Sequence, residues 1–295
     1  MRGERGAQRA RGERGALEGP SLAIQIGSSM RVAVAGLGAV GLPVAQLLAT
    51  GGIKGMTLAA VSASSPASAA SKLSADVPCL PLAELAACAD VVVEGLPPSK
   101  FLSVAEPTLA AGRTLVALSV TQVLQNYEQL ETLAAASGGR IVVPTGALAG
   151  LDAVKAAAEG GHVRSVVMQT RKPPKSLQNA PFVQEQGLDL SSLSEAKQLY
   201  AGSVRDAAQL FPANVNVAVA LSLAGVGPDL TQYEIWADPE VERNTHLYRV
   251  ESDESNFEVR VAGVPSATNP ATGALTPLSA IATLRGMVST VRVGT

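Results

Sequence analysis

The chain contains two histidines, and one of them, His246, ends a run of polar residues that begins at Ala237 and reads Asp-Pro-Glu-Val-Glu-Arg-Asn-Thr in between. Histidine titrates near neutrality, so it is the side chain best suited to carry a proton to and from a reacting group. A hydrogen-bonded structural histidine is the alternative. The adjacent Arg243 and Asn244 favour the catalytic interpretation, whereas His162 follows two glycines without a motif and is expected on the surface.

A glycine-rich turn is the second chemical signal. Gly36, Gly38 and Gly41 have the spacing G-x-G-x-x-G directly after a short β-rich run. In that context the first glycine permits a tight turn, the second lets the backbone approach a pyrophosphate, and the third lets a helix pack closely on the strand. Ala39 and Val40 would then offer free backbone N–H groups at the positive end of the helix. A tight turn that binds nothing is the alternative interpretation.

The end of the next predicted strand bears on the choice of cofactor. An Asp or Glu there would hold the ribose of NAD and repel the phosphate of NADP. This chain instead has Ser62 in the run Ala60-Val-Ser-Ala-Ser-Ser65, and Lys72 is the nearest cation. The hydroxyl groups could donate to a 2′-phosphate, so the sequence predicts a site for NAD or NADP.

These residues need a framework, and the first half of the chain provides alternating strands and helices. Short runs of buried character are separated by helical stretches, which predicts a Rossmann-type, doubly wound parallel sheet over residues 30–145. The expected strands are 31–35, 56–62, 90–94, 114–118 and 140–143, and the expected helices include 42–49 and 128–136.

The second half, residues 146–272, has a different pattern of polar and apolar residues. Segments 163–170, 233–237, 247–250 and 257–261 alternate polar and apolar residues, as strands with one solvated face do. Segments 194–210 and 217–224 are expected to be helices on the other face of this sheet. The prediction is a second α+β domain with a mixed or antiparallel open sheet, while a final helix within residues 273–295 completes the first domain.

Composition excludes several classes of protein. The 295 residues suffice for two domains, and 23 basic against 25 acidic residues argue against nucleic-acid binding. Cys79 and Cys88 are too few for a metal cluster, so we expect no metal. The longest apolar run, Val217 to Gly227, falls well short of the roughly 20 residues that span a bilayer. We expect a soluble, cytoplasmic protein with a small-molecule ligand and no membrane partner.

Residues 1–29 form a low-complexity segment in which Arg-Gly-Glu-Arg-Gly-Ala occurs twice, from Arg2 and from Arg11. Such a segment has no apolar periodicity to dock it, so we expect a disordered tail. An extension ahead of a functional start at Met30 is the favoured explanation. A transit peptide is the alternative, although its acidic residues count against it.

Several stretches of the chain together resemble the L-aspartate dehydrogenase family over residues 30–295. The matching stretches are Pro144-Thr-Gly-Ala-Leu-Ala-Gly-Leu-Asp-Ala153, Thr170-Arg-Lys-Pro-Pro-Lys175, Phe211-Pro-Ala-Asn-Val-Asn-Val217, Ala237-Asp-Pro239, Arg243-Asn-Thr-His246 and Asn269-Pro-Ala-Thr272 with Leu284-Arg285. Ala271 departs from the family, which usually has a lysine there, and the turn Glu94-Gly-Leu-Pro-Pro98 also differs.

The resemblance implies a reaction and a set of site residues. The reaction is the reversible conversion of L-aspartate and NAD(P)+ to iminosuccinate, and then to oxaloacetate and ammonia. The family's active-site histidine corresponds to His246, and its cofactor contacts in the second half correspond to Ala147 and Asn216. The resemblance also implies that the open sheet pairs between subunits in a homodimer.

A substrate with two carboxylates needs cationic partners, ideally arginine. The candidates are Arg171, Lys172, Arg243 and Arg285, with Asn244 beside them, and the sequence does not rank them. Each could instead be a solvated charge at the end of a strand or helix. Asp238, which precedes a proline, is expected to be a turn residue.

Two other functions remain open at this point. One is a related imine or semialdehyde oxidoreductase of the same architecture, which would act on a different amino acid. The other is a non-catalytic NAD(P)-binding module, which would keep the three glycines of the loop but have no need for His246 beside Asn244.

Overall fold

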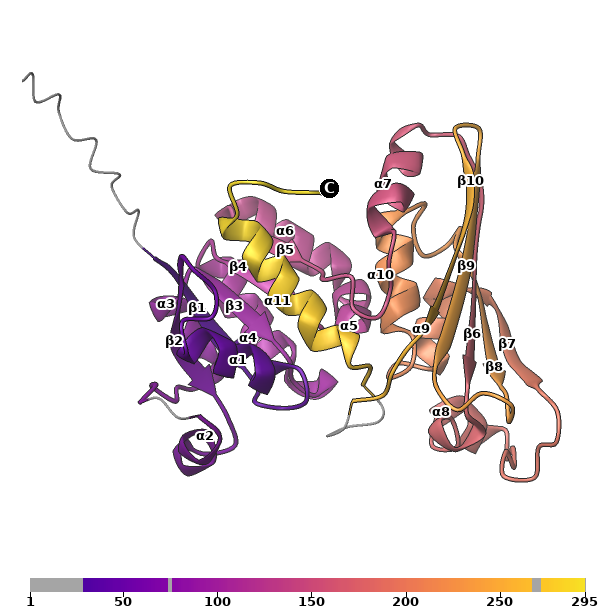
Figure 1. Cartoon of the computed structure of the whole chain (residues 1–295), viewed down its shortest axis with the longest axis horizontal. Helices are drawn as coiled ribbons and strands as arrows, with labels where there is room; N and C mark the ends of the chain where they lie inside the picture. Colours follow the sequence, from indigo (N-terminus) through magenta and orange to yellow (C-terminus); the bar gives the residue numbers. More distant parts are fainter. Residues whose placement is uncertain (1–28, 74–75, 267–271, 295) are drawn as a thin grey trace, which may run out of the picture.

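The computed structural model describes residues 29–73, 76–266 and 272–294, which form two five-stranded sheets with helices around the first and on one side of the second (Figure 1). Almost all of the predicted tail, and also Ala271, lie outside the described residues. Within the described part of the chain, no helix combines the length and the apolar character needed to cross a membrane.

The first sheet is parallel throughout, with strand order β2-β1-β3-β4-β5. Its strands are β1 (Met30–Ala35), β2 (Met56–Ser62), β3 (Val91–Glu94), β4 (Thr114–Ala117) and β5 (Arg140–Val142). The central strands are rich in valine and alanine because both of their faces are covered. The predicted doubly wound sheet is confirmed.

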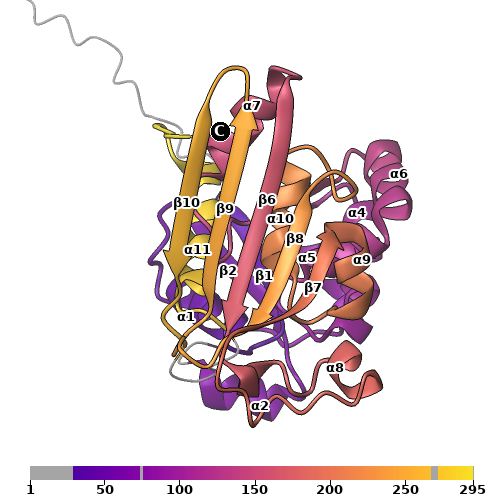
Figure 2. The same cartoon turned by 90° about the vertical axis from the view of Figure 1, so that its right-hand side faces the viewer.

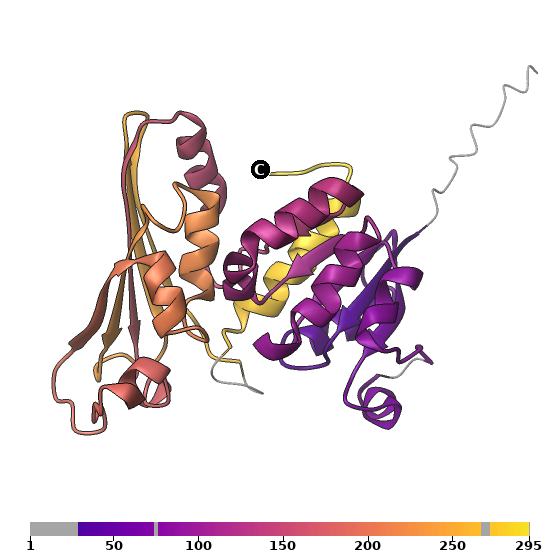
Figure 3. The ribbon, with the colours of Figure 1, turned by 180° about the vertical axis from the view of Figure 1, so that it is seen from behind.

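Helices cover both faces of this sheet, as Figures 1 and 3 show from opposite sides. The C-terminal helix α11 (Leu275–Val288) packs beside α1 (Gly41–Ala49), and its Ala280 and Leu284 are buried in the same core as Val44 of α1. The helices around this sheet are α1 (Gly41–Ala49), α2 (Pro66–Lys72), α3 (Leu85–Cys88), α4 (Leu102–Ala110), α5 (Val120–Gln125), α6 (Tyr127–Ser137) and α11 (Leu275–Val288), with short 3-10 turns at Leu82–Glu84 and Pro98–Lys100.

The second sheet is mixed, with strand order β10-β9-β6-β8-β7, and only its β6–β8 pair is parallel. Its strands are β6 (Val163–Lys172), β7 (Lys197–Ser203), β8 (Gln232–Ala237), β9 (Thr245–Ser252) and β10 (Asn256–Ala262). The helices are α7 (Leu151–Glu159), α8 (Pro181–Glu185), α9 (Val204–Leu210) and α10 (Asn216–Ala224), with a 3-10 turn at Pro174–Ser176. Helices α7, α9 and α10 cover the inner face, and Figure 2 looks onto the uncovered outer face.

The predicted helix over residues 194–210 is wrong in its first half. Residues Lys197–Ser203 form the edge strand β7, antiparallel to β8, and α9 starts only at Val204. Ser203 caps this helix, because its hydroxyl accepts a hydrogen bond from the backbone N–H of Asp206 at 3.1 Å. Pairing with β8 outweighs the helical tendency of residues 197–203. The cap at Ser203 is the local signal in the sequence for where the helix begins.

The chain passes between the two sheets twice, once from β5 to α7 and once from β10 to α11. Side chains also bridge the two parts. Asn216 of α10 accepts hydrogen bonds from the backbone N–H and hydroxyl of Thr121 at 2.9 and 2.7 Å, and Ser279 of α11 accepts one from the N–H of Gly146 at 3.1 Å. The two sheets are thus held in a defined relation on either side of the space between them.

Candidate active site

A cavity of about 490 Å³ lies where the two parts of the chain meet. One side is formed by the glycine-rich turn and by the loops after β3, β4 and β5. The other side is formed by β6, β9 and the start of α10. Of the residues predicted for the site, Gly38, Ala39, Val40, Ala147, Lys172, Asn216, Asn244 and His246 line it. The volume is in the range of small-molecule sites.

The glycine-rich turn is shaped to admit a ligand at one of its glycines. Gly36 has a φ of +94°, and a Cβ there would lie 2.5 Å from the carbonyl oxygen of Gly95. A Cβ at Gly41 would lie 1.9 Å from the carbonyl oxygen of Gly36. At Gly38 nothing lies within 4 Å, so this position is open to the cavity. Gly36 and Gly41 therefore shape the turn, and Gly38 leaves room for a ligand.

The backbone donors beside Gly38 fit an anionic group. No acceptor among the described residues pairs with the N–H groups of Ala39 and Val40, which lie just before α1. Free N–H groups at a helix start, together with the helix dipole, bind phosphate oxygens. The turn therefore fits the pyrophosphate of a dinucleotide.

A buried carboxylate supports the floor of the cavity. Glu94, at the end of β3, is fully buried and accepts hydrogen bonds from the N–H groups of Leu96, Leu118 and Ser119 and from the Ser119 hydroxyl. Burial raises the pKa of Glu94, and these hydrogen bonds oppose the rise. The carboxylate joins the loops after β3 and β4, which both line the cavity.

The end of β2 lies beside the glycine-rich turn. The carbonyl of Ser62 accepts a hydrogen bond from the N–H of Gly36 at 2.9 Å, but Ser62 itself is buried and is not one of the cavity residues. Lys72 of α2 donates to the carbonyl oxygen of Leu37 at 3.2 Å, so a cation stands at the turn. A carboxylate is missing from the end of β2, as the sequence indicated, and a positive charge lies close to it.

His246 is held on the second sheet by one contact of its ring with Thr170. β9 pairs with β6 so that His246 lies opposite Thr170, and the Thr170 hydroxyl lies 3.0 Å from Nδ1 of the ring. The imidazole lines the cavity, which leaves Nε2 as the nitrogen available to a ligand. Burial, and then the charge of Lys172, lower the pKa of His246 to about 3. At this pKa the ring is neutral near pH 7, and the acid/base role of His246 stays a prediction.

Lys172 is the cation in this cavity. Its ammonium group donates to Oδ1 of Asn214 at 2.9 Å and lies 3.4 Å from the carbonyl oxygen of the same residue. Burial lowers the pKa of Lys172 to about 8. Among the described residues no carboxylate forms an ion pair with it. A buried cation without a counter-ion is costly unless a ligand supplies the negative charge.

Arg171 is not part of this site, contrary to the sequence-based expectation. Side chains alternate along β6, so Arg171 faces the outer side of the sheet while Lys172 faces the cavity. The guanidinium of Arg171 pairs with Asp238 at 2.8 Å and lies 4.9 Å from the ring centroid of Trp236. Asp238 also accepts a hydrogen bond from the N–H of Glu240 at 2.9 Å, as the predicted turn residue would.

The other two predicted arginines also lie away from the cavity. Arg285, in the second half of α11, is exposed and donates to the carbonyl oxygen of Gly52 at 2.7 Å. Arg243 is exposed in the turn between β8 and β9 and is not one of the cavity residues. Arg243 was a candidate because it is close to His246 in the sequence, but the fold does not bring its side chain to the cavity.

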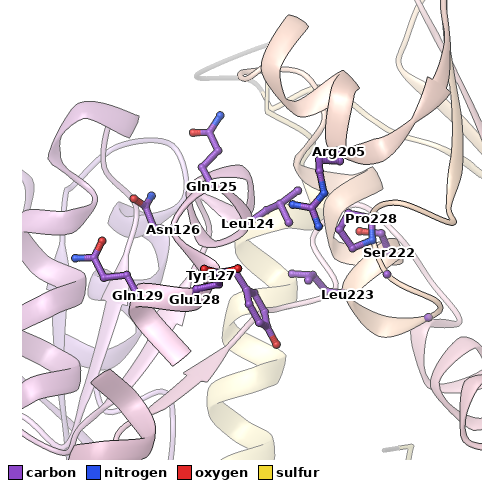
Figure 4. Close-up of a pocket in the computed structure, with 12 residues that line it drawn as sticks. Leu124, Gln125, Asn126, Tyr127, Glu128, Gln129, Arg205, Ser222, Leu223 and Pro228 are labelled. Carbon is purple, nitrogen blue, oxygen red and sulfur yellow. The ribbon is translucent and has the colours of Figure 1, made fainter. Parts of the chain in front are cut away.

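A second cavity, of about 540 Å³, lies between α5–α6 and the region of α9 and α10 (Figure 4). Several of its polar side chains are already paired within the protein. Arg205 binds Asp229, Gln125 donates to the carbonyl of Ala208, and Ser222 donates to that of Val219. Its arginine is therefore already neutralised by a carboxylate, whereas Lys172 in the first cavity is not, in the described part of the chain. Within the described residues there is also no group of metal ligands.

Comparisons with known proteins agree with this geometry. The family described as "Aspartate dehydrogenase, C-terminal" matches residues 152–287, and "Homoserine dehydrogenase, NAD binding domain" matches residues 36–144. L-aspartate dehydrogenase 3 of Bordetella bronchiseptica is 49% identical over 90% of this chain and 97% of its own length. L-aspartate dehydrogenase of Bradyrhizobium diazoefficiens is 47% identical over 91% of this chain and 95% of its own.

The fold comparison agrees with these matches. The crystal structure of aspartate dehydrogenase from Thermotoga maritima has a TM-score of 0.66 at 26% identity and covers 90% of this chain and 99% of its own. A dinucleotide-binding sheet, joined to a mixed sheet that presents a histidine and a lysine, defines an NAD(P)-dependent oxidoreductase. More particularly, the chain belongs to the L-aspartate dehydrogenase family.

Two residues that contact side chains of the site were not proposed from the sequence as functional. Thr170 and Asn214 stood within the stretches that resemble the family, but only the fold brings them to His246 and Lys172. Thr170 could have been predicted as a site residue from the sequence. Side chains alternate along a strand, so Thr170 shares a face with Lys172 and not with Arg171.

We predict that the enzyme accepts NADP within about two orders of magnitude of NAD, because no carboxylate at the end of β2 repels the 2′-phosphate. Ser62→Asp should shift the ratio of kcat/KM values toward NAD. Ser194→Asp adds the same charge at an exposed site in the second half of the chain and should leave the ratio unchanged. A native enzyme that ignores NADP, with no effect of Ser62→Asp, would show that the ribose site is elsewhere.

Proposed function

We propose that this chain catalyses the reversible, NAD(P)-dependent oxidative deamination of L-aspartate to iminosuccinate, and so to oxaloacetate and ammonia. One observation carries the proposal. Lys172 is a buried cation in the cavity, with no carboxylate paired to it among the described residues, and it stands beside a neutral histidine. A dianionic substrate provides the missing charge, and the relatives named above are L-aspartate dehydrogenases.

In this proposal Lys172 binds a substrate carboxylate. Asn214 holds the ammonium group with two of its acceptor atoms and fixes its direction without neutralising it. Asn244, which also lines the cavity, can donate a hydrogen bond from its amide to the same substrate. The substrate carboxylate completes an ion pair with Lys172. The lysine is already desolvated before the substrate binds, so binding carries less of the free-energy cost of desolvation.

His246 becomes an effective proton carrier only when the substrate is present. In the free protein its imidazole is neutral, because burial and Lys172 disfavour the charged form. A bound carboxylate offsets the charge of Lys172, and the second carboxylate adds negative charge close to the ring. Both effects raise the pKa of His246 toward the working pH. The site is thus inactive as a proton carrier until the dianion enters.

The proton steps then follow from the position of Nε2. In the direction of synthesis, ammonia adds to C2 of oxaloacetate, and Nε2 carries a proton from the new nitrogen to the oxygen, which gives a neutral carbinolamine. Nε2 next delivers a second proton, taken from solvent, to the hydroxyl as it leaves as water. The product is the protonated imine, and the reverse sequence hydrates it. A positioned histidine is suited to both transfers.

A dinucleotide fits the remaining part of the cavity and, when bound, supplies or accepts the hydride at C2. The N–H groups of Ala39 and Val40 would hold its pyrophosphate. Asn216 uses its amide oxygen for Thr121, so its amide nitrogen is left to donate toward the cavity. Ala147, in the loop after β5, lines the same side. Positioning of the reacting carbon against the cofactor is the protein's contribution to this step.

The proposal extends to the organisation of the chain. Residues 30–145 with 273–295 bind the cofactor, and residues 146–272 bind the substrate and form a homodimer through the outer face of the second sheet. That face is not covered by helices (Figure 2) and carries the partly exposed side chains of Val167, Trp236 and Leu247. We place the enzyme in the cytoplasm, where free thiols such as those of Cys79 and Cys88 persist.

The first test is oxidation of NADH or NADPH in the presence of oxaloacetate and ammonia. The enzyme should turn over with this four-carbon dicarboxylate and not with monocarboxylate 2-oxo acids or semialdehydes. His246→Asn keeps some hydrogen bonding but cannot titrate, and it should lower kcat by about 10²–10⁴ with cofactor affinity unchanged. Activity confined to another imine or semialdehyde would remove the assignment, and near-normal kcat in His246→Asn would remove the acid/base role.

A second prediction concerns Lys172→Met, which keeps the length of the side chain but not its charge. Loss of a charged hydrogen bond should raise KM for oxaloacetate by about 10- to 100-fold. The native kcat/KM for oxaloacetate should fall as pH rises through about 8, because the ammonium group then loses its proton. Lys172→Met should lack this decline, and Lys175→Met, an exposed lysine nearby, should behave as the native enzyme. An unchanged KM in Lys172→Met would exclude the carboxylate contact.

The proposed dimer gives a third prediction. Light scattering should report about twice the chain mass of 30.0 kDa. Leu247→Glu places a charge on the outer face and should give a folded monomer, as judged by circular dichroism. Leu230→Glu is the control, because Leu230 is 69% exposed in the turn before β8. A native monomer at micromolar concentration, or a Leu247→Glu dimer, would contradict this interface.

A further inference from the structure

The first cavity carries no acidic side chain among the described residues. Of the described residues that line it, only Lys172 and His246 have basic side chains, and none is Asp or Glu. Lys172 is only 7% exposed, so water screens its charge poorly. The protein therefore leaves one positive charge in the cavity without a carboxylate to compensate it.

Asn214 is the residue that contacts the ammonium group. Nζ of Lys172 donates to Oδ1 of Asn214 at 2.9 Å and to the backbone carbonyl oxygen of Asn214 at 3.4 Å. Asn214 lies in the turn between α9 and α10, and its N–H donates to the carbonyl oxygen of Phe211 at 2.8 Å. Phe211 and Val215, at the two ends of this turn, are fully buried. The turn therefore holds Asn214 firmly against the ammonium group.

The chemical type of this partner is informative, because asparagine and aspartate have the same shape. Asn214→Asp would create a buried ion pair with Lys172 and would remove the cost of an uncompensated charge. Asparagine accepts the same hydrogen bond but has no charge. Its amide nitrogen donates to no acceptor among the described residues, and Asn214 lines the cavity, so this nitrogen can donate to a ligand. Stability alone therefore does not explain an amide at this position.

We propose that Asn214 sets the specificity of the site for anionic ligands, because as a neutral partner it orients the Lys172 ammonium group and leaves its charge for a carboxylate of the ligand. The proposal rests on the carboxylate contact of Lys172 in the proposed function. The other titratable groups nearby do not compensate this charge. His246 on β9 is neutral, and Asp238 after β8 is paired with Arg171 on the outer face. Neither the turn that holds Asn214 nor α10 carries a titratable side chain.

Two substitutions at Asn214 separate this role from simple packing. Asn214→Asp supplies an internal counter-charge, so it should raise the melting temperature and raise KM for oxaloacetate by about tenfold or more. Asn214→Ala removes the contact without adding charge, so it should lower the melting temperature and raise KM less than Asn214→Asp does. A packing role predicts the opposite order for KM, because aspartate keeps the shape of the side chain. A higher KM in Asn214→Ala, or a lower melting temperature in Asn214→Asp, would overturn the proposal.

The pH profile gives a readout that a packing role would not change. The native kcat/KM for oxaloacetate should fall as pH rises through about 8, where Lys172 loses its proton. The carboxylate of Asn214→Asp favours the protonated lysine and raises its pKa, so the decline should begin at a higher pH. Asn179→Asp adds the same charge at an exposed position in the second half of the chain and should keep the native KM and profile. A native profile in Asn214→Asp would contradict the proposed role.

Succinate tests the site without the reaction, because it has the two carboxylates of oxaloacetate but no carbonyl group. In calorimetric titrations with NADH or NADPH present, the native enzyme and Asn179→Asp should bind succinate with equal affinity. Asn214→Asp should bind it about tenfold more weakly or worse. Equal affinity in Asn214→Asp, or no binding of succinate to the native enzyme, would overturn the proposal. Absence of turnover with oxaloacetate and ammonia, while this difference in succinate affinity is retained, would count against the proposed function and leave the role of Asn214 supported.

Discussion

The register of β6 is the constraint on which the site depends. This strand is hydrogen-bonded to β9 on one side and to β8 on the other, and it places Thr170 opposite His246 while Lys172 faces the same side. A slip of one residue would turn Arg171 into the cavity, where its guanidinium would be buried without the carboxylate that now pairs with it. The two flanking strands and the buried core of Met168, Tyr233 and Tyr248 hold the register in place.

Two electrostatic consequences follow from that placement. Burial lowers the pKa of both Lys172 and His246, and the charge of Lys172 adds to the effect on the histidine, so the ring is neutral and the ammonium group has a pKa of about 8. A site of this kind is costly when empty, because its cation is desolvated without an anion. Ligand binding relieves that cost, so the arrangement favours a negatively charged occupant over a neutral one of the same shape.

The sequence allowed much of the fold to be predicted, and less of the site. The glycine-rich turn, the five parallel strands and the returning C-terminal helix follow from local patterns, since each is encoded within a few consecutive residues. β7 did not, because an edge strand depends on its neighbour and residues 194–203 favour a helix by composition. The arginines show the same limit: Arg285 lies near the first sheet and Arg171 behind the second. Only the alternation of β6 could have separated Arg171 from Lys172 in advance.

The two chain crossings between the sheets are also walls of the cavity. Pro144 to Ala147 follow β5, and Thr272, Gly273 and Thr276 precede or begin α11, and all of these residues line the site. A change in the angle between the two sheets would therefore act directly on residues that line the cavity. Substrate affinity and the angle between the two parts of the chain would then be coupled.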